Sequence, residues 1–165
     1  MKDTAVLYGS TTGNTEIVAK IIAKELDAAI FDVTSQPVSE IHKYQNFVLG
    51  TSTLGIGDLQ DDWDVFLPAF AKADLKGKTI ALFGLGDADI YPDSFVDGMG
   101  IIYEAIKNKG CTIVGQVDTD CYEFDASNAV VDGKFVGLPL DEDNQSDLTD
   151  ERIKAWIEQI KAEFS

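Results

Sequence analysis

The chain has 165 residues, 45% of them hydrophobic, which fits one soluble globular domain spanning residues 1–165. Its 29 acidic residues outnumber 13 lysines and arginines, so the net charge at pH 7 is −16. A surface of this charge repels nucleic acid and anionic membranes, and it favours partner proteins with basic docking surfaces. We expect a monomer that binds neither nucleic acid nor membrane.

Short apolar runs alternate with amphipathic stretches along the whole chain, which is the pattern of strands alternating with helices. Two of the amphipathic stretches show a clear helical period. The first places Ile17, Val18, Ile21, Ile22 and Leu26 on one apolar face, and the last places Ile153, Trp156, Ile157, Ile160 and Phe164 on one apolar face. In chain order we predict a strand at Thr4–Tyr8, a helix at Asn14–Leu26, strands at Ala28–Val33 and Asn46–Gly50, a helix at Asp61–Lys72, a strand at Lys78–Phe83, a helix at Val96–Lys109, a strand at Thr112–Val117, and a last helix with Thr149 as its N-cap.

This order predicts an α/β fold, a three-layer sandwich whose five-stranded parallel sheet has the order 2-1-3-4-5. One segment breaks the alternation. From Asp118 to about Pro139 the chain is too long for a simple loop, and it contains the apolar pieces Ala129–Val131 and Lys134–Leu138. We interpret it as an insertion that interrupts the fifth strand.

The remaining features predict a cytoplasmic protein without a metal. The N-terminal apolar run ends at Gly9 and is too short for a signal peptide, and no stretch reaches membrane-spanning length. Cys111 and Cys121 match no metal or redox spacing, so we expect free thiols in a reducing compartment. His42 has no neighbouring ligand residue, and we interpret it as a surface residue.

The first candidate binding loop, Gly9–Thr15, joins the first strand to the first helix and consists of small polar residues. Free N–H groups at a helix N-terminus favour an anion, and glycines let the backbone approach it. The loop has neither a Walker nor a dinucleotide motif, and it contains no Lys or Arg. It suits a single terminal phosphate held by neutral donors. The alternative is an ordinary polar turn with a helix cap.

Two further loops follow the third and fourth strands and would meet the first at the switch point of the sheet. Thr51–Asp58 carries Leu54 and Ile56 between glycines, which suits a lid over a flat apolar ligand, or a loop that packs on its own helix. Gly84–Asp93 carries Tyr91, which can stack on a planar ring or close the end of the core. Together the loops predict a phosphate pocket beside two walls for a ring.

With these loops in this order, the sequence resembles the flavodoxins, specifically the long-chain type. The resemblance covers essentially the whole chain and is carried by residues 9–15, 50–63, 86–87 and 91, the inserted segment 122–139, and the run 140–150. It implies non-covalently bound flavin mononucleotide (FMN). The chain would be a low-potential one-electron carrier that passes through oxidised, neutral semiquinone and hydroquinone states, and not an enzyme. Its partners would be redox proteins such as a flavodoxin/ferredoxin reductase and a low-potential oxidoreductase.

The resemblance also implies roles for individual residues. Asp87 would lie near the pyrimidine edge, Asp143 near the ribityl chain, and Tyr91 on the outer ring face. A flip of the Gly55 peptide would stabilise the semiquinone. The phosphate would be held by Ser10, Thr11, Thr12, Gly13, Asn14 and Thr15, the inner face lined by Thr53, Leu54, Gly55, Ile56 and Gly57, and the remaining contact made by Gly86.

One position departs from the family pattern, because Leu54 stands where many flavodoxins have a tryptophan. Leucine covers part of a ring but cannot stack on it, so we expect that face to be less shielded.

Acidic residues of the same loops would make the second electron harder to add. At an effective dielectric constant of ~40, they would lower the second reduction potential by on the order of 100 mV in total.

Two rival functions give different expectations. A flavin-dependent NAD(P)H or quinone reductase would need a second nucleotide site, and no such fingerprint is present. A receiver domain would need a phosphoacceptor Asp after the third strand, where Thr51 and Ser52 stand.

Overall fold

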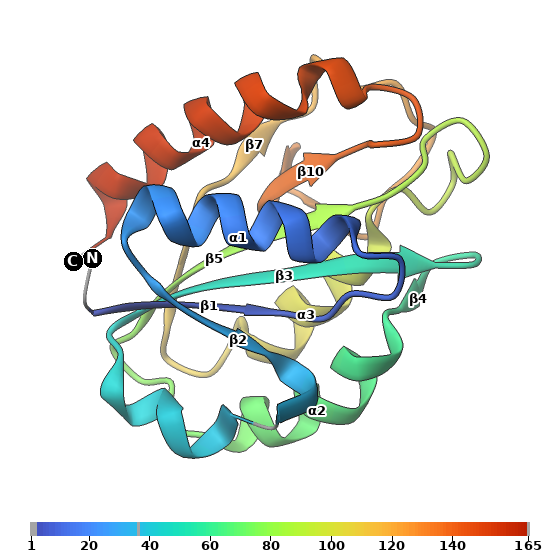
Figure 1. Ribbon diagram of the computed structural model, residues 1–165. Helices are drawn as coiled ribbons and strands as arrows, with labels where there is room; N and C mark the ends of the chain where they lie inside the picture. Colours follow the sequence, from blue (N-terminus) through green and yellow to red (C-terminus); the bar gives the residue numbers. More distant parts are fainter. Residues whose placement is uncertain (1–2, 36, 165) are drawn as a thin grey trace.

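The protein is described by a computed structural model that covers residues 3–35 and 37–164. A twisted parallel sheet forms its centre, in the order β2-β1-β3-β5 (Figure 1). Strand registers pair Thr4 of β1 with Asn46 of β3, and Asn46 with Thr79 of β5. These strands span Thr4–Tyr8 (β1), Ala29–Asp32 (β2), Asn46–Leu54 (β3) and Thr79–Leu85 (β5).

The fifth position of the sheet is filled by two separate strands, which confirms the predicted order and the interruption. Thr112–Val114 (β6) pairs with the first half of β5, and Leu138–Leu140 (β10) pairs with its end. Between them, Val117–Asp118 (β7), Val130–Val131 (β8) and Lys134–Phe135 (β9) form a small antiparallel sheet.

The insertion begins earlier than predicted, because Val117 pairs with Phe135 of the small sheet and not with β5. The chain leaves the main sheet after Val114. The Gly115 carbonyl accepts a hydrogen bond from the Trp156 indole N–H (2.8 Å), so the last helix holds the chain there.

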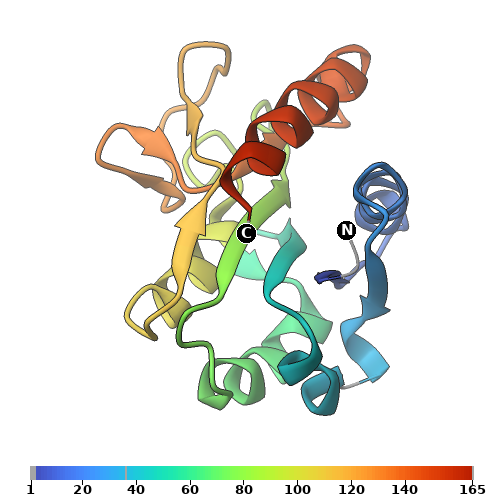
Figure 2. The same cartoon turned by 90° about the vertical axis from the view of Figure 1, so that its left-hand side faces the viewer.

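Helices cover both faces of the sheet (Figures 1 and 2). Side chains alternate between the faces along each strand, so Val6 packs under α1 and α4 whereas Ala5 and Leu7 pack under α2 and α3. The helices are α1 (Asn14–Leu26), α2 (Asp61–Lys72), α3 (Asp97–Ile106) and α4 (Thr149–Glu163). The predicted face of α4 is confirmed, since Ile153, Trp156, Ile157, Ile160 and Phe164 are all buried.

The buried face of α1 and the N-cap of α4 differ from the prediction. Ile17 and Ile21 are 59% and 36% exposed, whereas the small residues Ala19 and Ala23 are buried and form part of the face of α1 that packs on the sheet. Thr149 is not the N-cap of α4. Leu148 occupies that position, and the Thr149 hydroxyl is hydrogen-bonded to the Glu142 carboxylate.

Other boundaries also shift. The predicted helix at Val96–Lys109 is shorter, whereas β3 and β5 run further than predicted, to Leu54 and Leu85. Two 3₁₀ helices, Val33–Ser35 (η1) and Pro37–Lys43 (η2), lie in a segment for which no helix was predicted. None of the helices in the described residues combines the length and apolar character that a membrane crossing requires.

Candidate functional site

A cavity of about 270 Å³ lies at the carboxyl edge of the sheet, where the loops after β1, β3 and β5 meet the segment after β10. This is the edge at which ligands bind in open parallel sheets. The cavity is lined by Thr11, Thr12, Asn14, Thr15, Ser52, Thr53, Leu54, Gly55, Leu85, Gly86, Asp87, Tyr91, Ser94, Glu142 and Asp143.

Most of the predicted site residues therefore meet around one cavity, whereas Ser10, Gly13, Ile56 and Gly57 do not line it. The Ile56 side chain is 83% exposed, so only Leu54 of the predicted apolar lid contributes to the cavity wall. No individual role was predicted for Ser52, Leu85, Ser94 or Glu142. Ser52 and Leu85 lie within the predicted loops Thr51–Asp58 and Gly84–Asp93, but they belong to the ends of β3 and β5, which run further than predicted.

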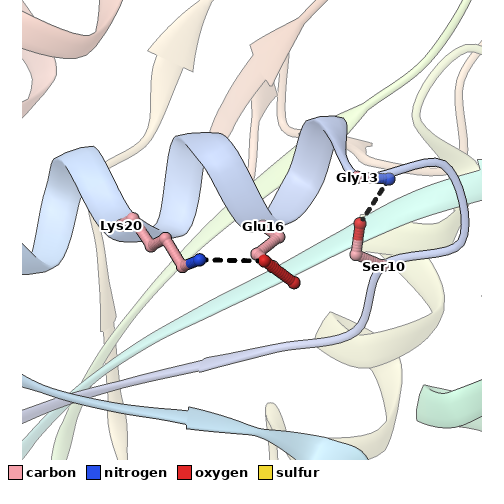
Figure 3. A network of polar contacts seen from close by, with 4 residues as sticks. All are labelled: Ser10, Gly13, Glu16 and Lys20. Carbon is pink, nitrogen blue, oxygen red and sulfur yellow. Dashed lines mark hydrogen bonds and ion pairs between the residues drawn. The ribbon is translucent and has the colours of Figure 1, made fainter.

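The loop after β1 is held in shape by a hydrogen bond between its backbone and the Ser10 side chain. The Gly13 N–H donates to the Ser10 hydroxyl (3.1 Å), as Figure 3 shows, so Ser10 organises the loop from outside the cavity. The first turn of α1 leaves N–H groups without intrahelical acceptors, beside the hydroxyls of Thr11, Thr12 and Thr15. Lys20 pairs with Glu16 (2.9 Å), and among the described residues that line the cavity there is no lysine or arginine.

The loop after β3 is a tight hairpin with β4 (Asp58–Leu59), in which Leu54 faces Asp58. Gly55 and Gly57 have φ angles of +50° and +87°, which side chains rarely adopt. The base of the hairpin is fixed to α3, because the Gly98 N–H donates to the Thr53 hydroxyl (2.9 Å). A side chain at residue 55 would strain the backbone in this conformation, even without a flip of the Gly55 peptide.

The loop after β5 is organised by the Asp87 carboxylate. Its Oδ1 accepts hydrogen bonds from the N–H groups of Asp89 (3.1 Å) and Ile90 (3.0 Å) and from the Asn144 amide (2.8 Å). Partial burial alone would raise the pKa of Asp87, but these three bonds outweigh it and lower the pKa. Tyr91, which follows this turn, is 37% exposed.

The segment after β10 adds negative charge to the cavity. Asp141 is buried and accepts hydrogen bonds from the Ala88 N–H (3.1 Å) and from the backbone and amide of Asn144. Burial, together with the charges of Asp87, Asp141 and Glu142, raises the pKa of Asp143. Asp87, Asp141 and Asp143 approach one another within 4.8 Å, but hydrogen bonds already occupy the first two, and we assign no metal to them.

Ser52 supplies an independent sign of a ligand. Within residues 3–35 and 37–164, its hydroxyl is the one buried side-chain oxygen or nitrogen that lacks a hydrogen-bond partner. A buried hydroxyl without a partner costs free energy, and a polar ligand in the adjoining cavity would remove that cost. The donors of the cavity are neutral and its rim is acidic, which fits a ligand with one anionic end and a neutral polar body.

A parallel sheet covered by helices, with a loop free of lysine and arginine at the start of its first helix, is typical of α/β proteins that bind a ligand at the carboxyl edge of the sheet. Residues 6–156 match the sequence model of the flavodoxin family, and the chain belongs to that family.

It is 45% identical to a flavodoxin of a Nostoc species (strain PCC 7120), over 99% of this chain and 98% of that one. It is also 45% identical to the flavodoxin of Helicobacter pylori, over 97% of each chain. Among solved structures, that of Fusobacterium nucleatum flavodoxin bound to flavin mononucleotide matches with a TM-score of 0.92 and 34% identity, over 100% of both chains.

Proposed function

We propose that the chain binds one FMN non-covalently in this cavity and carries single electrons between redox proteins in the cytoplasm. The observation that carries the proposal is the cavity itself, which joins a helix N-terminus with neutral donors to the side chains of Leu54 and Tyr91. The family and the FMN bound to the Fusobacterium relative support the same assignment.

The phosphate would lie at the start of α1. The helix dipole and the unpaired N–H groups of the first turn favour an anion there. The hydroxyls of Thr11, Thr12 and Thr15 and the Asn14 amide, which all line the cavity, would complete the donor set. Because no lysine or arginine is among the described residues of the cavity wall, each donor has to be well directed for the phosphate to bind.

The flavin ring would lie between residues of the other two loops. Tyr91 offers an aromatic face for stacking, and Leu54 offers apolar contact without stacking. The Ser52 hydroxyl would donate to a polar atom of the ligand, which would satisfy the unpartnered group.

Bound flavin supplies chemistry in which electrons are transferred one at a time. The protein's own contribution is electrostatic. Asp87, Glu142 and Asp143 surround the cavity, so added negative charge on a ligand is disfavoured and its reduction potential is lowered. The same charge, −16 over the chain, would steer partners with basic surfaces such as a flavodoxin/ferredoxin reductase.

Purified protein tests the proposal directly. We expect the visible absorption spectrum of a flavoprotein, and we expect acid precipitation to release FMN in about equal molar amount to protein. Release of flavin adenine dinucleotide, or failure of the flavin-free protein to bind FMN, would contradict the assignment. Rapid reduction of the bound flavin by NAD(P)H without another protein would favour the reductase function instead.

A further inference from the structure

Gln60 joins the loop after β1 to the start of α2, although 49 positions separate it from its partner in the loop. Its side-chain Nε2 donates to the Thr11 hydroxyl (3.2 Å) and to the Asp62 carboxylate (2.8 Å). Gln60 is 1% exposed and does not itself line the cavity, whereas Thr11 does. Thr11 is therefore the hydrogen-bonded partner of Gln60 that lines the cavity.

The orientation of the Gln60 amide is fixed by the helix that it caps. Its Oε1 accepts hydrogen bonds from the N–H groups of Asp62 and Trp63, both at 3.1 Å. Trp63 is fully buried, and its indole N–H donates to the Gly50 carbonyl (2.7 Å). With Oε1 committed to the cap, Nε2 necessarily faces Thr11.

This arrangement determines which atom Thr11 presents to the cavity. A threonine hydroxyl has one proton to donate and two lone pairs that accept. Since Gln60 donates to one lone pair, the hydroxyl proton stays available for an acceptor, such as a phosphate oxygen. A carboxylate at residue 60 would instead accept that proton and turn a lone pair toward the anion.

We propose that Gln60 is a positioning residue that directs the Thr11 proton toward a phosphate, and so selects phosphorylated over unphosphorylated flavin. The inference rests on the proposed function, because it assigns the phosphate of FMN to this loop. It goes beyond it in naming a residue outside the cavity that sets the ligand preference.

The test is a charge-conserving exchange, Gln60→Glu combined with Asp62→Asn, compared with wild-type protein, and Asp62→Asn alone reports the effect of losing the Asp62 carboxylate. The double variant keeps an acceptor for the α2 cap and the net charge, but it removes the donor to Thr11. The readout is the ratio of the riboflavin to the FMN dissociation constant, from fluorescence titration of flavin-free protein. We expect the ratio to fall about tenfold or more, the usual effect of one hydrogen bond to a charged group.

The same comparison in proteins that also carry Thr11→Val separates the effect of Gln60 on the Thr11 hydroxyl from a direct effect of the moved charge on the ligand. Without the hydroxyl, the exchange should change the ratio by about twofold or less, as expected when Gln60 acts only through Thr11. Thr12→Val is the matched control, because Thr12 lines the same cavity and no hydrogen bond joins it to Gln60 in the described structure. In that background the tenfold fall should persist.

The outcomes distinguish the inference from the proposed function. An unchanged ratio, or equal weakening of both flavins, would overturn the positioning role and leave FMN binding intact. If wild-type protein binds inorganic phosphate but no FMN, the proposed function fails, and phosphate affinity of the same variants still decides the role of Gln60. If it binds neither, both fail.

A second measurement needs no change at residue 60, in case the exchange prevents folding. Hydrogen bonds in a chain polarise one another, so the Gln60 side-chain amide signals in ¹⁵N NMR spectra should shift when inorganic phosphate is added to wild-type protein. The shift should be absent in Thr11→Val. Absence of the shift in wild-type protein that binds phosphate would overturn the inference.

Discussion

The hairpin tip offers a test in which backbone strain and steric overlap can be measured separately. At Gly57, φ is +87° and an added Cβ would lie 2.8 Å from Oδ2 of Asp97. Asp97 cannot easily move, because it is buried and accepts hydrogen bonds from the Asn128 N–H (2.7 Å) and amide (3.1 Å). Left-handed strain costs about 1–2 kcal/mol and the overlap about 1–3 kcal/mol more, so Gly57→Ala should destabilise the protein by about 2–5 kcal/mol.

Gly55→Ala is the matched control, because it has a positive φ (+50°) but its added Cβ would meet only Oδ2 of Asp58, at 3.6 Å. It should cost only the strain, about 1–2 kcal/mol. The assay is urea unfolding of flavin-free protein, followed by tryptophan fluorescence. In an Asp97→Ala background, the cost of Gly57→Ala should fall toward that of Gly55→Ala, and the Ser94 Cβ at 3.3 Å is then the nearest contact of the added Cβ. Equal costs for both glycines in the wild-type background would refute the idea that Asp97 is held rigidly.

Three further predictions concern the cavity. Tyr91→Ala should weaken FMN binding by about 1–3 kcal/mol if the ring stacks on flavin, and an unchanged dissociation constant would return Tyr91 to a packing role. Ser52→Ala should weaken FMN binding by about 1 kcal/mol without lowering the stability of flavin-free protein, because its hydroxyl lacks a partner there; calorimetric titration and urea unfolding measure the two effects. Asp87 has a pKa below its ordinary 3.8, so its network stabilises the fold above that pH and loses this effect as pH falls through the lowered pKa. The destabilisation caused by Asp87→Asn should accordingly be present at neutral pH and disappear in acid, and a constant stability difference across an acid unfolding series would contradict the network.

The layers of the fold could be predicted because each depends on local periodicity. The apolar spacing of α4 identifies its buried face, and alternation of strands with helices gives the sheet order. The apolar face of α1 was placed partly wrongly, since Ile17 and Ile21 fit the helical period but are exposed, whereas Ala19 and Ala23 are buried. Large apolar residues dominate the periodic pattern, so it does not show that small residues occupy the buried face.

The candidate site was predictable where its residues are consecutive in sequence. Gly9–Thr15 stands out as a run of small polar residues. Ser52 lies within a predicted loop, but its own role was not predicted, because the sequence does not show which side chains of a loop face the cavity; the same holds for Glu142. Between Thr11 and Gln60 the chain forms α1, two 3₁₀ helices and the strands β2, β3 and β4, so only the folded chain brings these side chains into contact.

In the part of the chain that the structure describes, the cavity is lined by no lysine or arginine, and this links the binding of a phosphate to the reduction potential of a bound flavin. A lysine in the loop after β1 would strengthen phosphate binding, but its charge would also offset the carboxylates of Asp87, Glu142 and Asp143. At ~12 Å and an effective dielectric constant of ~40, one charge contributes about 0.7 kcal/mol, or roughly 30 mV for one electron. Hydroxyl and N–H dipoles act over shorter distances than a full charge, so they can hold the phosphate without raising the potential at the ring. Asp143→Asn should therefore raise the potential of the more negative one-electron step by about 30 mV in a redox titration, and a potential equal to that of wild type would show that screening removes the effect of these carboxylates.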